Sequence, residues 1–112
     1  MHKKTWIKVN VQVDEGIKEL VEALSAFPKL QTIESCQGSQ NTPAWVCFYY
    51  GNSISELSDF VLRYLGKELA EKLGDRVSLS IQIKSSGLPQ GELQVRHEAI
   101  RICTKVLKQL AS

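Results

Sequence analysis

Residues 30–50, LQTIESCQGSQNTPAWVCFYY, decide the fold. Leu30–Cys36 and Ala44–Tyr50 are rich in β-branched and aromatic residues, which favour strands. Between them, residues 37–43 contain glycine, serine, asparagine and proline, which form turns. We therefore predict a hairpin in which two strands are joined by a long loop.

The longest predicted helix follows this hairpin directly. Gly and Asn at 51–52 end the second strand, and Ser53 with Glu56 three residues later forms a capping box. Gly66 weakens the helix slightly, and Gly74 suits its left-handed C-terminal cap. The apolar face consists of residues at helical spacing, namely Ile54, Leu57, Phe60, Val61, Tyr64, Leu65, Leu69 and Leu73.

The remaining elements are predicted from periodicity. Apolar and polar residues alternate in 5–13 and in 77–84, which is typical of half-buried strands. We also expect a short strand at 91–96, after a loop at 85–90, and a final helix at 98–110. The first helix has an apolar stripe that ends at Pro28, and its members are Ile17, Leu20, Val21, Leu24 and Phe27.

The resulting order is βαββαββα, and its first six elements follow the split βαβ arrangement of ferredoxin-like proteins. We therefore predict an α+β two-layer sandwich, a ferredoxin-like variant with a mainly antiparallel sheet and helices on one face. We expect residues 1–112 to form a single domain, because 12.6 kDa fits one domain. The other face of the sheet is then bare or covered by a partner.

Composition excludes several classes of protein. The net charge is only +2 and the charges are interleaved, which is not the pattern of an electrostatic nucleic-acid binder. No apolar run approaches the roughly 20 residues of a membrane span, so we expect a cytoplasmic protein without membrane association. Three cysteines without CxxC spacing and only two histidines indicate neither a disulfide framework nor a metal site, and we expect no cofactor.

The loop after the first hairpin strand is the candidate ligand site. Gly38 permits close backbone approach, and its neighbours offer uncharged hydrogen-bonding groups for a small polar ligand. Arg96 and His97 stand at a predicted helix start and could complete an anion site. Alternatively, the loop satisfies its own backbone, His97 is a cap, and Cys36 is a packing residue. The candidate ligand-binding residues are Ser35, Cys36, Gln37, Gly38, Ser39, Arg96 and His97.

Two resemblances rest on this loop. The T-x-x-S-C-x-G pattern of residues 32–38, within residues 5–50, resembles a group of small bacterial proteins without an assigned function. Ser35-Cys36-Gln37-Gly38 is more distantly similar to the Ser-Cys-Ser-Gly-Arg loop of wybutosine-synthesis methyltransferases, which act on transfer RNA. Gln37 replaces the second serine of that loop and Ser39 its arginine, so we transfer no activity.

The open sheet face is the second candidate. We expect Trp6, Trp45 and Tyr49 on it, although the alternate set Val46, Phe48 and Tyr50 competes for the core with Trp45, Cys47 and Tyr49. Exposed aromatic residues favour a homodimer, since monomers rarely leave large apolar patches uncovered. The alternatives are that the long loop covers these rings, or that they stack on RNA bases.

We therefore predict a binding or self-assembling domain, with an RNA-binding or RNA-modification-related protein as the alternative. An enzyme is a third possibility, but no nucleophile set, carboxylate pair or P-loop can be located, so catalytic residues stay unassigned. We expect any small-molecule site at the Ser35–Thr42 loop. The long helix is not expected to hold it, because charged residues such as Glu56 and Asp59 suit a solvated surface.

Overall fold

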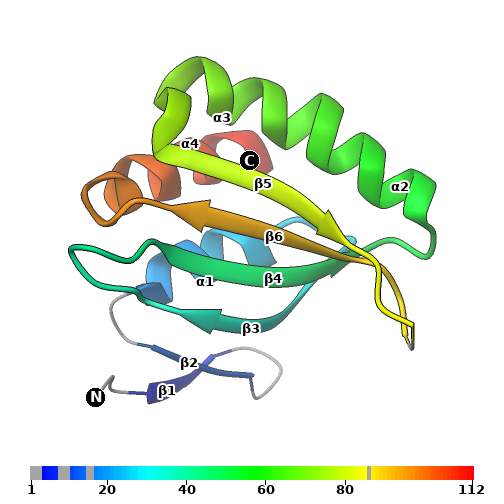
Figure 1. The fold of residues 1–112 in the computed structure, drawn as a ribbon, viewed down its shortest axis with the longest axis horizontal. Helices are drawn as coiled ribbons and strands as arrows, with labels where there is room; N and C mark the ends of the chain where they lie inside the picture. Colours follow the sequence, from blue (N-terminus) through cyan, green and yellow to red (C-terminus); the bar gives the residue numbers. More distant parts are fainter. Residues whose placement is uncertain (1–3, 8–10, 15–16, 86) are drawn as a thin grey trace.

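The four-stranded sheet in the computed structural model has the order β3-β4-β6-β5, and every neighbouring pair is antiparallel (Figure 1). The structure describes residues 4–7, 11–14, 17–85 and 87–112, the first two ranges by their backbone alone. The strands are β3 (Leu30–Cys36), β4 (Ala44–Tyr50), β5 (Val77–Gln82) and β6 (Gln90–Val95). The predicted α+β class and antiparallel sheet are confirmed.

The register of β4 decides which face of the sheet is the core. Val46 lies opposite Leu93 of β6, and both are fully buried. Phe48 is also fully buried, whereas Trp45 and Tyr49 are half-buried on the other face. Because side chains alternate along a strand, this register places Val46 and Phe48 under the helices and Trp45, Cys47 and Tyr49 on the opposite face.

The helices pack on the face that carries Val46 and Phe48. They are α1 (Lys18–Ser25), a long segment made of α2 (Ile54–Ser58), the π-helix η2 (Asp59–Leu65) and α3 (Gly66–Leu73), and the C-terminal helix α4 (Ile100–Ala111). Short 3₁₀ turns at Gly74–Arg76 and His97–Ala99 precede β5 and α4. Their buried residues form one core with those of the sheet, and α1 and α4 are drawn behind the strands in Figure 1.

The capping box at the start of the long segment is confirmed. The Ser53 hydroxyl accepts the Glu56 N–H at 3.2 Å, and the Glu56 carboxylate accepts the Asn52 N–H at 3.0 Å. These two bonds satisfy amide groups that a helix start leaves without partners inside the helix. In the described part of the chain, no helix combines the length and hydropathy needed to cross a membrane.

The π-helical segment explains why residue 66 is a glycine, which from sequence was expected only to weaken the helix slightly. The Gly66 N–H donates to the carbonyl oxygen of Val61, five residues earlier, which is the spacing of a π-helix. A Cβ at position 66 would lie 2.7 Å from that oxygen. Glycine therefore permits the wider turn at this position.

The N-terminal strand differs from the prediction. Residues 5–13 were expected to form one strand of the main sheet, but β1 (Lys4–Ile7) and β2 (Val11–Asp14) pair with each other in a separate two-stranded sheet. Period-two alternation suits one long strand or two short ones, because it carries no information about pairing partners. In the sheet, β6 lies between β4 and β5, although it follows both of them in the chain.

Candidate functional site

The loop after β3 closes largely on itself. The Ser39 N–H donates to the Thr42 carbonyl at 2.8 Å, and the Asn41 N–H donates to the Ser39 hydroxyl at 3.3 Å. Gly38 has a φ of +66°, and a Cβ there would lie 2.7 Å from the carbonyl carbon of Pro43. The glycine is thus required by the loop's own closure, independently of any ligand.

The other loop candidates lie around the end of β3. Cys36 and Gln37 are half-buried, and the hydroxyl of Ser35 is buried without a hydrogen-bond partner. Residues 37–43 and Arg96 lie at the same end of the sheet, because Ala44 pairs with Val95 (Figure 1). His97 instead lines a hollow of about 490 Å³ between α1 and α4, and no loop residue lines it. The structure therefore gathers the loop and Arg96 at one sheet end but places His97 in another environment.

The open sheet face holds Trp45, Tyr49 and the carboxylate of Glu92. The Glu92 carboxylate accepts hydrogen bonds from Gln82 at 3.1 Å, from Gln94 at 2.7 Å and from the Cys47 thiol at 3.5 Å. Trp6 lies on β1, outside the main sheet, and its side chain is not among those that the structure describes. The expectation that Trp6 shares a sheet with Trp45 and Tyr49 is therefore wrong.

Cys47 and Cys103 are poor nucleophiles because the pKa of each thiol is raised. Burial and the neighbouring Glu92 carboxylate raise the pKa of Cys47 to about 11. Burial raises the pKa of Cys103 to about 12. Because the thiolate is the nucleophile, both side chains stay protonated and unreactive near neutral pH. Among the described residues, no group of three or more potential metal ligands comes together.

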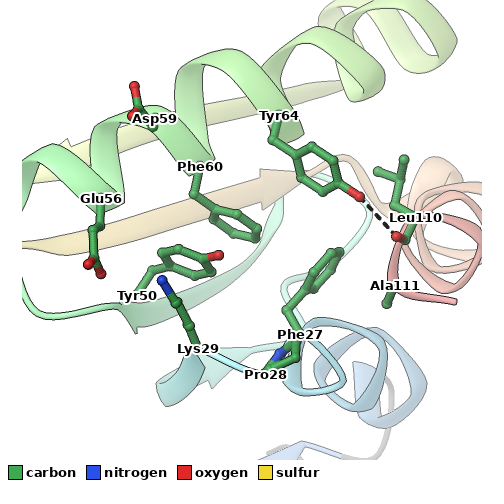
Figure 2. A pocket seen from close by; sticks show the side chains of 10 residues that line it. All are labelled: Phe27, Pro28, Lys29, Tyr50, Glu56, Asp59, Phe60, Tyr64, Leu110 and Ala111. Carbon is green, nitrogen blue, oxygen red and sulfur yellow. Dashed lines mark hydrogen bonds between the residues drawn. The ribbon is translucent and has the colours of Figure 1, made fainter.

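A hollow with aromatic walls lies elsewhere, between the long helical segment, the ends of β4 and α4, and the turn after α1 (Figure 2). Its volume is about 510 Å³. We call it the aromatic pocket, and its lining residues are Phe27, Pro28, Lys29, Tyr50, Glu56, Asp59, Phe60, Tyr64, Leu110 and Ala111.

Four aromatic side chains form the walls of the aromatic pocket. Phe60 is central: its ring stacks on Tyr50 with 3.9 Å between centroids and meets Phe27 edge-on at 5.2 Å. The ring of Tyr64 lies 5.9 Å from that of Phe60. Phe27 and Phe60 are anchored in the core, while Tyr64 is 39% exposed. The pocket is therefore lined by buried rings on its inner side and is open to solvent on its outer side.

The polar groups around the aromatic pocket are mostly engaged. The Tyr64 hydroxyl donates to the Leu110 carbonyl at 2.9 Å (Figure 2). The Glu56 carboxylate accepts a hydrogen bond from the Asn52 N–H. Asp59 forms an exposed ion pair with Arg63 at 3.5 Å, and Figure 2 shows its carboxylate pointing away from the rings.

The sequence analysis missed this pocket. Phe27, Phe60 and Tyr64 were assigned to apolar helix faces, while Glu56 and Asp59 were taken to indicate a solvated surface without a pocket. No enclosed pocket was expected there: Asp59 is exposed, and both acidic residues stand at the rim of a hollow that is open to solvent. Its walls come from segments far apart in the chain, and no local pattern brings Phe27 to Tyr64.

Comparison with protein-family models, curated proteins and solved structures finds no match to this chain. The two resemblances of the loop at residues 32–38 therefore stay predictions.

Proposed function

We propose that the protein is a small-molecule-binding module whose site is the aromatic pocket. Its volume of about 510 Å³ is typical of ligand sites, which range over roughly 300–1,000 Å³. Aromatic walls with a few polar groups at the rim are also typical of such sites. The fitting ligand has a small, flat, apolar body, because rings favour offset-stacked and edge-to-face contacts.

The π-helix supports this proposal. Wider helical turns of this kind occur frequently at functional sites. Here η2 carries both Phe60 and Tyr64, so the irregular turn and the pocket wall are the same segment. The carboxylates of Glu56 and Asp59 are held by Asn52 and Arg63, which favours binding over acid-base catalysis.

Two adjacent tyrosines allow a matched test. Tyr50 lines the aromatic pocket, whereas Tyr49 lies on the opposite face of the same strand. A panel of one-ring aromatic compounds should bind the wild-type protein, measured by thermal shift and titration. Tyr50→Leu should weaken binding about three- to tenfold, the value of one ring contact, and Tyr49→Leu should not. Equal binding to both variants, each with wild-type circular dichroism, would refute the assignment.

A second function, self-association in the cytoplasm, remains our proposal for the open sheet face. It is supported by the half-buried Trp45 and Tyr49, which lie on the face opposite the helical core. RNA binding at this face is less favoured, because the carboxylates of Glu34 and Glu92 would repel phosphate groups.

Light scattering tests self-association. A Trp45→Ala variant should shift the mass in solution from dimer to monomer, because interface tryptophans often contribute 2 kcal/mol or more, about thirtyfold in affinity. A wild-type protein that stays monomeric at high concentration would contradict this second function.

A further inference from the structure

Lys29 stands at the mouth of the aromatic pocket and is the only cationic residue in its described lining. Its backbone is fixed: its carbonyl oxygen accepts the Gly51 N–H at 3.1 Å, and the next residue, Leu30, pairs with Tyr50. The side chain is exposed and forms no salt bridge with any acidic residue that the structure describes. Lys29 is therefore a solvent-exposed cation on a fixed backbone, at the mouth of a hollow with aromatic walls.

The acidic residues that line the pocket, Glu56 and Asp59, form no ion pair with Lys29. Glu56 lies in the same lining, but its carboxylate accepts the Asn52 N–H, and no Lys29–Glu56 ion pair forms. Asp59 is directed at Arg63 and away from the rings (Figure 2). The Lys29 ammonium is therefore open to an ion pair with a ligand carboxylate.

From this arrangement we propose that the aromatic pocket takes a small carboxylic acid with an aromatic body, its carboxylate paired with Lys29. This inference rests on the proposed function and names its ligand class. The ring of such a ligand contacts Phe27, Phe60 and Tyr64, and its carboxylate reaches the ammonium at the mouth. Hydrogen bonds between an ammonium and a carboxylate are stronger than those between neutral groups, so the acid is preferred over its neutral analogue.

Three probes that share one ring and one linker length separate the possibilities: phenylacetate, phenylacetamide and phenethylamine. Titration calorimetry at low ionic strength should give phenylacetate an affinity about 1.5- to fivefold higher than the amide, the range for a solvent-exposed ion pair. The preference should fall as sodium chloride is raised, because salt screens exposed charges.

Variants of Lys29 complete the test. Lys29→Met should abolish the preference for phenylacetate over the amide, and Lys29→Arg should keep it. The matched control is Lys67→Met, which removes an exposed cation of α3 outside the pocket and should change nothing.

The outcomes separate this inference from the function on which it rests. Equal affinity for acid and amide, or a preference for phenethylamine, overturns the carboxylate assignment while the pocket stands as a site. If none of the three probes binds at millimolar concentration to folded protein, both the inference and the proposed function are overturned.

Discussion

The Tyr64 hydroxyl lies 2.9 Å from the carbonyl oxygen of Leu110, to which it donates a hydrogen bond. This contact joins the π-helical segment to the end of α4 across 46 residues of sequence. It also fixes the ring of Tyr64 as a wall of the aromatic pocket, because the hydroxyl is turned toward α4 (Figure 2).

Removing this hydroxyl should destabilise the protein modestly. We expect Tyr64→Phe to lower the free energy of unfolding by about 0.5–1.5 kcal/mol, the usual net value of one hydrogen bond. Urea denaturation measures the change. Tyr49→Phe, which removes a hydroxyl on the open sheet face, is the control and should have little effect. Equal losses in the two variants would show that the bond to Leu110 contributes nothing specific.

Gly66→Ala should destabilise the protein, although alanine favours helices over glycine by about 1 kcal/mol. The added Cβ would lie 2.7 Å from the Val61 carbonyl oxygen, so the π-helical turn would have to shift. Ala70→Gly in the exposed part of α3 is the reference for propensity alone. The prediction fails if Gly66→Ala raises the denaturation midpoint.

Stability should fall in alkaline solution through the buried thiols. The pKa of Cys47 is raised by burial from its ordinary value of 9.0 to about 11, so between these values the unfolded chain loses a proton that the folded protein keeps. The favourable contribution is full below pH 9 and is lost as the pH rises to 11. Cys103, with a pKa of about 12, acts in the same direction.

Denaturation curves between pH 8 and 11 measure this dependence. The double variant Cys47→Ala and Cys103→Ala should show a shallower loss of unfolding free energy than the wild-type protein. An unchanged slope in the double variant would contradict the role given to the two thiols.

Gly38→Val should strain the loop without affecting the ligand site. Gly38 has a positive φ, and the backbone of Pro43 leaves no room for a side chain. We expect lower thermal stability but unchanged affinity for phenylacetate. A selective loss of binding, with the melting temperature preserved, would return the ligand site to the loop at residues 35–42.

Local patterns predicted most of the fold. The alternation at Val77, Leu79 and Ile81 and the capping box at Ser53 are properties of neighbouring residues, and both elements form as expected. The strand at residues 5–13 was wrong because alternation does not specify a pairing partner. The choice between the two faces of β4 also needed the register with β6, which puts Val46 opposite Leu93.

The candidate site was harder to predict because it depends on tertiary packing. Phe27 follows α1, Tyr50 ends β4 and Leu110 lies in α4, so their meeting requires the complete helical layer. Glu56 and Asp59 have the composition of a solvated helix surface, and the hollow beside them also needs Tyr50, the turn after α1 and the end of α4. The sequence of the loop at Gly38 is unusual for a local reason, because the loop needs a glycine there in order to close on itself.

The most direct test of the pocket is the position of a bound ligand. Nuclear Overhauser effects between the ring protons of phenylacetate and the protein, measured in solution, report which side chains lie close to it. We predict contacts with the rings of Phe27, Phe60 and Tyr64. Contacts with Trp45, or with the loop at Ser39, in place of these rings would contradict the assignment of the aromatic pocket as the binding site.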